Sequence, residues 1–227
     1  MKAHSFIYLI IYSCFIMSVS LQAQEHFADR YNVSYITMDD GLPHNFIDDI
    51  YKDTRGFLWI STAGGGLSRY DGYEFIHFNP NTPHSKLKSN FIHNVYEDRF
   101  HRLWIVSEGG TDIIDLSTLQ SVIPNDPKGL LPRFINHPTY IVILDSQGCI
   151  WLQCDNALHR ITFDAEGGID TLSTLDLPEQ DEPDLILKDI DEDGKIWTGI
   201  NGTIYKITPT PQGQLEKSSI SEQLTFW

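Results

Sequence analysis

The sequence contains few cysteines and few basic residues, and both shortages exclude classes of protein. Only 3 of its 227 residues are cysteines, and Cys149 and Cys154 stand an odd number of positions apart in one expected strand, so their side chains point to opposite faces. We therefore expect neither a disulfide between them nor a metal site built on them. The chain has 16 Lys and Arg residues against 31 Asp and Glu residues, a formal net charge of −15. This charge repels nucleic acids and anionic lipid headgroups, so neither is an expected partner.

The chain also lacks the short motifs that carry catalysis or nucleotide binding. No Gly-x-Ser-x-Gly elbow, His-Glu-x-x-His pair, phosphate-binding loop or dinucleotide fingerprint occurs. The glycine run at residues 64–66 lies inside an expected hairpin and does not open a helix, so we interpret it as a turn. We therefore expect no catalytic residue and no cofactor, and this chain is not expected to be an enzyme.

The first 23 residues have the pattern of a secretory signal peptide. Lys2 supplies the positive end, residues 6–19 form an apolar stretch, and Ala23 precedes a polar segment. We expect cleavage after Ala23 and export of residues 24–227. Leu21 stands where a small residue is preferred, so an uncleaved signal that anchors the chain in the inner membrane is the alternative.

Four tryptophans recur at a nearly constant spacing. Intervals of 45, 47 and 46 residues separate Trp59, Trp104, Trp151 and Trp197, and a period in this range is typical of propellers or solenoids. An Asp-x-x-Gly turn precedes the tryptophan in three copies, whereas the second copy has His101 in place of the glycine, so we expect a different turn there. Further turn signals divide each copy into four short strands, which is the content of one propeller blade. We expect the tryptophans to form the structural core between blades.

The repeat resembles the two-component regulator propeller repeat. The resemblance rests on the Asp-x-x-Gly turn, the apolar-Trp-apolar core, the Gly-rich turn, an apolar-x-Arg-Tyr strand and the lead-in at residues 35–45, and it covers about residues 31–209. It implies the N-terminal periplasmic sensor of a Bacteroidetes hybrid two-component system that detects glycans or oligosaccharides. It also implies seven-bladed rings and a histidine kinase in the full-length protein. With about four repeats and no kinase, we expect this chain to be a truncated member.

These observations predict an all-β fold, a β-propeller with about four four-stranded blades in an incomplete ring. The predicted blades span about residues 45–78, 90–123, 137–177 and 184–220, and residues 31–38 are predicted to form a strand that would close the ring. An open ring leaves a blade face exposed, so we expect self-association through it. A compact four-bladed ring is the alternative.

Three functions are consistent with this fold, and the sensor is the leading one. It would be a periplasmic ligand-sensing module for glycans, with downstream sensor domains or a kinase as partners if the gene continues. A propeller lyase of the streptogramin-inactivating type is the enzymatic alternative, but it needs a complete ring and a His with an acidic partner at the channel mouth, and the sequence reveals neither. A secreted binding or scaffold propeller is the third.

Polar residues recur where the chain enters the first strand of each expected blade. Asn45, Asn90 and His137 each stand fourteen residues before a tryptophan. They are the candidate ligand-binding residues, at one mouth of the central channel, where propellers commonly bind ligands. Capping of the turn is the alternative role for the same side chains.

One segment has part of the spacing of a calcium loop. Asp189, Asp191 and Asp193 alternate before Gly194, as the carboxylates of such a loop do. The position that needs a bidentate Glu holds Ile200, and the segment aligns with the ordinary turn of the other repeats. We therefore expect no bound metal and keep this segment as a weak calcium candidate.

Overall fold

The computed structural model describes residues 34–83, 86–177, 186–191, 195–200 and 203–219. The chain divides into two units, Met1–Ile36 and Thr37–Trp227. The expected signal peptide lies outside the described residues. In the part of the chain that is described, no helix is long and apolar enough to cross a membrane.

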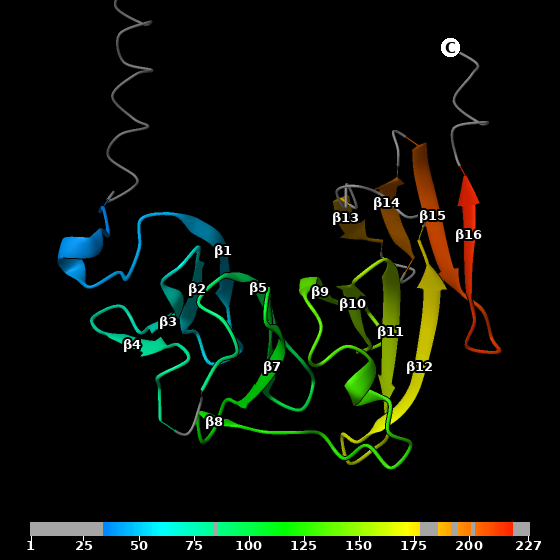
Figure 1. Cartoon of the computed structure of the whole chain (residues 1–227), viewed down its shortest axis with the longest axis horizontal. Helices are drawn as coiled ribbons and strands as arrows, with labels where there is room; N and C mark the ends of the chain where they lie inside the picture. Colours follow the sequence, from blue (N-terminus) through cyan, green and yellow to red (C-terminus); the bar gives the residue numbers. More distant parts are fainter. Residues whose placement is uncertain (1–33, 84–85, 178–185, 192–194, 201–202, 220–227) are drawn as a thin grey trace, which may run out of the picture. The chain divides into compact units, whose positions relative to one another are not determined.

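The second unit consists of four antiparallel sheets, each with four strands in sequence order (Figure 1). The first strand of each sheet lies nearest a common centre, and the last strand lies at the periphery. This arrangement confirms the predicted β-propeller blades. The blades contain β1 (Ile47–Lys52), β2 (Leu58–Thr62), β3 (Gly66–Tyr70) and β4 (Phe75–Phe78); β5 (Ile92–Glu97), β6 (Arg102–Ser107), β7 (Gly110–Asp115) and β8 (Gln120–Ser121); β9 (Thr139–Leu144), β10 (Ile150–Cys154), β11 (Ala157–Phe163) and β12 (Ile169–Asp176); and β13 (Ile186–Ile190), β14 (Ile196–Ile200), β15 (Thr203–Pro209) and β16 (Leu215–Ser219).

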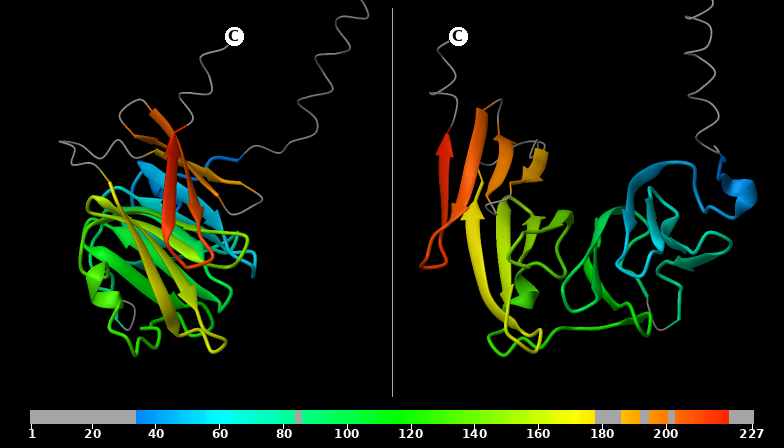
Figure 2. Two further views of the ribbon diagram at one scale, coloured as in Figure 1. Left: turned by 90° about the vertical axis from the view of Figure 1, so that its right-hand side faces the viewer. Right: turned by 180° about the vertical axis from the view of Figure 1, so that it is seen from behind.

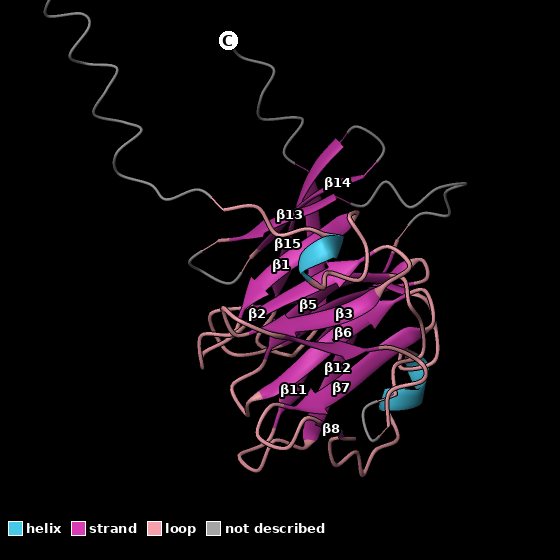
Figure 3. Cartoon of the chain, turned by 90° about the vertical axis from the view of Figure 1, so that its left-hand side faces the viewer, coloured by secondary structure: helices cyan, strands magenta, loops and turns pink. Residues whose placement is uncertain are grey.

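The described helical residues form two short 3₁₀ turns, η1 (Met38–Asp40) and η2 (Leu131–Arg133) (Figure 3). The first of these turns corrects the strand predicted over residues 31–38. Residues 34–37 have no regular secondary structure, and residues 31–33 lie outside the described part. Thr37 instead starts the turn as its N-cap, since its own N–H donates to the Asp40 carboxylate at 2.8 Å while its hydroxyl accepts from Asp39 N–H at 3.3 Å. This capping box satisfies the local backbone without a neighbouring strand.

The turn between the first two strands of each blade binds the tryptophan. One carboxylate oxygen of the turn aspartate accepts backbone N–H groups of the turn, and the other accepts the indole N–H. The spacing of six residues between Asp and Trp is therefore a hydrogen-bond requirement as well as a packing one. The Oδ2 to Nε1 distances are 2.8 Å for Asp53–Trp59, 2.8 Å for Asp98–Trp104, 2.9 Å for Asp145–Trp151 and 3.0 Å for Asp191–Trp197.

The second blade keeps this turn without the glycine, which corrects the expectation of a different turn. His101 has a φ of 57°, in the left-handed region that Gly56 and Gly148 occupy with φ of 94° and 77°. Its N–H donates to the carbonyl of Asp98 at 3.1 Å, as a glycine would at this position. A left-handed conformation costs a non-glycine residue roughly 1–2 kcal/mol. The bond between His101 Nδ1 and Glu97 Oε1, at 2.8 Å, offsets part of this cost.

Each blade has two faces that pack differently. We call the face that carries the tryptophan the trailing face, and the opposite face, which carries the residues directly before and after the tryptophan, the leading face. The trailing face of one blade packs on the leading face of the next, and Trp59, Trp104 and Trp151 are fully buried there. Three apolar clusters result, around Trp59 with Leu103, Trp104 with Ile150, and Trp151 with Ile196.

Different strands make the contacts at different interfaces between blades. The first strands β1 and β5 contact each other, as do β5 and β9, whereas the third and fourth blades meet through their last strands, β12 and β16 (Figure 2). Asn94 joins the second and third blades, because its side-chain amide donates to the Val142 carbonyl and accepts from the Val142 N–H, both at 3.0 Å. The Asn94 side chain thus makes the two backbone hydrogen bonds at the edge of β9 that a neighbouring strand would otherwise make.

Candidate functional site

The residues that lead into the first strands of the first two blades cap their own turns. The His44 ring accepts the Phe46 N–H at 3.0 Å, and the Ser89 hydroxyl accepts the Phe91 N–H at 3.0 Å. The neighbouring Asn45 and Asn90 are exposed. The residue directly before each Asn-Phe pair therefore caps the turn, a role that the sequence analysis had considered for the asparagines. The Asn side chains are thus accessible to a ligand.

An exposed aromatic ring follows each of these asparagines. Phe46 is 62% exposed and Phe91 is 47% exposed, although each stands directly before an inner strand. The same residue lies between them, because Ala63 N–H donates to the Phe46 carbonyl at 3.2 Å and Ala63 forms an isolated β-bridge with Phe91. The Asn90 carbonyl also accepts the N–H groups of the neighbouring glycine turn, at 3.1 and 2.9 Å. The structure thus brings the first two predicted positions together around one hairpin.

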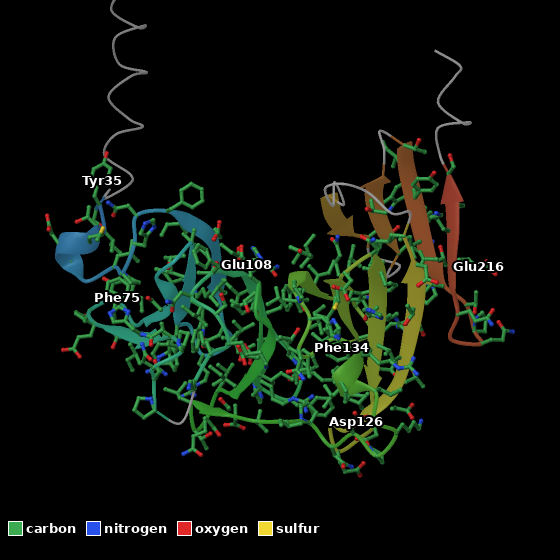
Figure 4. The ribbon with its side chains drawn as sticks, viewed as in Figure 1. Tyr35, Phe75, Glu108, Asp126, Phe134 and Glu216 are labelled. Atoms are coloured by element: carbon green, nitrogen blue, oxygen red, sulfur yellow. The ribbon has the colours of Figure 1, made fainter. Side chains whose placement is uncertain are left out.

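The next hairpin continues this surface. Glu108, labelled in Figure 4, lies between β6 and β7, and its N–H donates to the Phe91 carbonyl at 3.3 Å. The Glu108 side chain is exposed. This surface therefore consists of the segments that lead into the first strands, alternating with the hairpins between the second and third strands.

The third predicted residue, His137, has a different neighbour. Its Nδ1 lies 3.2 Å from Oδ2 of Asp155, and the two side chains are 50% and 60% exposed. Asp155 stands in the tight turn between β10 and β11, with a φ of 49°. The sequence could not reveal this pair, because the two residues are eighteen positions apart and meet only when β9 and β10 pair.

Every inner strand contains a β-bulge, which the sequence analysis did not predict. The pairing register shifts in β1 between Ile47 and Asp49, and β5, β9 and β13 have corresponding shifts. A bulge adds one unpaired residue and redirects its side chain, and bulges are frequent beside functional sites. The added residues are Asp48, His93, Tyr140 and Lys188.

Two of these bulge residues contact each other across blades. The His93 and Tyr140 rings have centroids 5.5 Å apart. Nε2 of His93 is buried and has no hydrogen-bond partner among the described residues. Asp48, at the same position of the first blade, is exposed. The bulges of the first three inner strands therefore carry a carboxylate, an imidazole and a phenol at equivalent positions.

A pocket of about 410 Å³ lies farther out on the second blade. Its apolar wall includes Ile113, Val122 and Ile135, and its polar wall includes Lys88 and Asp112. The Lys88 ammonium donates to Asp112 Oδ1 at 2.9 Å, and Asp112 Oδ2 accepts the Lys88 N–H at 2.8 Å. The charges of Lys88 and Asp112 are thus paired with each other.

The calcium candidate shares a residue with the fourth Asp–Trp turn. Asp191 accepts the Lys195 N–H at 2.9 Å through Oδ1 and the Trp197 indole through Oδ2. Asp193 lies outside the described residues, and Asp189 belongs to β13. Cys149 and Cys154 are free and buried, and burial raises the pKa of each thiol to about 11.

Comparisons with known proteins agree with this architecture. The sequence profile of the family described as two component regulator propeller matches residues 41–64 and 86–109, the lead-in and first hairpin of the first two blades. The chain is similar to the extracellular domains of two proteins described as hybrid two-component systems of Bacteroides thetaiotaomicron, BT3049 and BT4673. The identities are 19% and 24%, the TM-scores are 0.60 and 0.54, and the alignments cover 82% and 80% of this chain. No curated protein matches.

An enzyme is also among the similar structures. Virginiamycin B lyase from Staphylococcus aureus is 17% identical, with a TM-score of 0.50, over 78% of this chain and 56% of the lyase. The four blades and these similarities define the chain as a β-propeller. Its first two blades match the repeat of the two-component regulator propeller family. The chain spans 25% of the BT4673 domain and 26% of the BT3049 domain.

Proposed function

We propose that this chain is a ligand-sensing propeller of a hybrid two-component system, exported to the periplasm, and that its ligands are glycans or oligosaccharides. The observation that carries the proposal is the repeated pair of an exposed amide and an exposed ring, Asn45 with Phe46 and Asn90 with Phe91. An amide can donate to one sugar hydroxyl and accept from another, while a ring can pack on the apolar face of a pyranose. Two such pairs on neighbouring blades fit successive sugar units.

The charge of the chain selects among glycans. With a formal net charge of −15, the protein repels sulfated or uronic acid-rich chains unless a local cationic site offsets this field. The exposed Asp48 and Glu108 add negative charge near the same hairpins. We therefore expect neutral oligosaccharides to bind more tightly than anionic ones.

Calorimetric titration of the exported chain with neutral and sulfated oligosaccharides tests the proposal. We expect a neutral oligosaccharide to bind, and Asn90→Ala or Phe91→Ala to weaken its binding at least tenfold. Tyr73→Ala is the matched control, since Tyr73 is 91% exposed on the β3–β4 turn, away from the site. Failure of all neutral oligosaccharides to bind, or binding that Phe91→Ala leaves unchanged, would contradict the proposal.

The His137–Asp155 pair favours one alternative, a propeller lyase of the streptogramin-inactivating type. A carboxylate beside an imidazole orients the ring and supports its action as a general base. The lyase alternative therefore has the acid–base pair that the sequence did not reveal. Incubation of the exported chain with a type B streptogramin separates the two functions, because a lyase linearises the cyclic antibiotic and His137→Ala abolishes that turnover, whereas a sensor leaves the antibiotic intact.

A further inference from the structure

The fourth strand of the second blade is shorter than the fourth strands of the other blades, and a pocket lies where it stops. β8 pairs with only the last two residues of β7, Ile114 and Asp115, whereas β12 pairs with every residue of β11. Beyond β8, Thr111 N–H donates to the Ile135 carbonyl at 3.1 Å, so the segment before the third blade continues the edge of β7. The lining of the pocket lies entirely within residues 86–136. The pocket therefore belongs to the second blade and the segments that flank it.

The apolar wall of the pocket is aliphatic. Ile113 is 3% exposed and belongs to the apolar cluster around Trp104. Val122 and Ile135 pack against the same cluster, while Ile123 is 74% exposed and forms the rim. The described residues that line the pocket include no aromatic ring on which a pyranose could pack. The pocket is therefore a different kind of site from the Asn-Phe pairs, although its volume of about 410 Å³ is within the usual range for small ligands.

The polar residues of the pocket offer one unpaired positive charge and several unused donors. Lys88 neutralises Asp112, because both its ammonium and its backbone N–H donate to that carboxylate. The Lys86 ammonium, in contrast, has neither a hydrogen bond nor an ion pair with any described residue. The Ser121 hydroxyl and the Asn136 amide, which also line the pocket, have no hydrogen-bond partner among the same residues. All three groups can donate, so they suit a ligand with an anionic head group.

We propose that this pocket binds a small monocarboxylate with an apolar body, such as phenylacetate. The body covers the aliphatic wall, and the carboxylate accepts hydrogen bonds from Lys86 at the polar side. A neutral apolar molecule leaves the ammonium without a partner. A multiply charged anion finds only one unpaired cation there, within a chain of formal net charge −15 that repels it. A single carboxylate on an apolar body is the chemistry that matches both walls.

Titration of the ¹⁵N-labelled exported chain with phenylacetate at low ionic strength, followed by NMR, tests this site. We expect saturable binding that shifts the amide signals of Ile113 and Val122. Phenylacetamide has the same body and a neutral head group, so it should bind about fivefold more weakly. Lys86→Met removes the charge, and it should weaken phenylacetate binding to the same extent but leave phenylacetamide binding unchanged. Lys52→Met, at an exposed lysine of β1 outside the pocket, is the matched control and should bind both compounds like the original chain.

A second variant, Ile123→Asp, tests the apolar wall. The position is exposed, so circular dichroism should show that the variant keeps the fold, while the new carboxylate at the rim should abolish phenylacetate binding. The proposal is overturned if phenylacetate does not bind at millimolar concentration, or if phenylacetamide binds as tightly. It is also overturned if phenylacetate binds but neither Lys86→Met nor Ile123→Asp weakens its binding. None of these outcomes depends on an oligosaccharide, so they leave the proposed function to its own test.

Discussion

Removal of the Asp98 carboxylate should destabilise the protein more than removal of the Asp53 carboxylate, its counterpart in the first blade. This side chain is fully buried, and its two oxygens accept four hydrogen bonds. The indole of Trp104 donates at 2.8 Å, Nε of Arg102 at 2.7 Å, and the backbone N–H groups of Phe100 and Arg102 at 2.9 and 3.1 Å. Asp98→Ala leaves all of these donors without an acceptor, and it leaves the buried Arg102 guanidinium without its counter-charge.

The expected loss of stability follows from the unpaired charge of the Arg102 guanidinium. Breaking a buried ion pair by removal of one partner costs about 3–5 kcal/mol, so we expect the free energy of unfolding to fall by about 4 kcal/mol. Asp53 provides the comparison, because its carboxylate accepts the Trp59 indole and two backbone N–H groups but no hydrogen bond from a cation. Unsatisfied neutral donors cost about 1–3 kcal/mol. Asp53→Ala should therefore cost about 1–2 kcal/mol less than Asp98→Ala.

Urea unfolding, followed by tryptophan fluorescence and by far-ultraviolet circular dichroism, measures both losses. Coincident transitions in the two signals are required before the free energies are compared. Trp104→Phe is the additional control, because it removes the indole donor but leaves the bond between Asp98 and Arg102. If Asp98→Ala costs no more than Asp53→Ala, the counter-charge argument is refuted.

The remaining predictions concern His159, two glycines and two cysteines. Burial lowers the pKa of His159 below 6.5, so the unfolded chain binds the proton at a higher pH than the folded chain does. Stability should therefore fall as the pH drops through about 6.5. His159→Gln should flatten this part of the curve of unfolding free energy against pH. Gly56→Ala, at a φ of 94° and with open space around it, should cost roughly 1–2 kcal/mol. Gly110→Ala should cost more in the same urea assay, because its Cβ would also clash with a backbone carbonyl. Cys149 and Cys154, with the pKa of each raised to about 11, should react with a disulfide reagent at pH 8 only after urea is added.

The sequence predicted the blades because each blade is local. Turns, alternating apolar residues and a repeated tryptophan all lie within about 46 residues, and the first two copies have the same register. The exchange of Gly for His101 misled the turn prediction because residue preference is weaker than the set of hydrogen bonds made by Asp98. Of the strand predicted over residues 31–38, the described residues 34–38 form no strand, and Thr37 with Asp40 satisfies the local backbone there instead.

The candidate site was only partly predictable, since its features depend on pairing between strands. A fixed spacing made Asn45 and Asn90 candidate residues, but it did not predict the bulges beside them, because a bulge depends on how two strands pair and not on the sequence of one strand. The His137–Asp155 pair also forms through strand pairing. For the same reason, the repeat could not show that Ile50 is exposed while Val95 is buried. Both residues follow one pattern, and only the presence of a neighbouring blade distinguishes the buried residue from the exposed one.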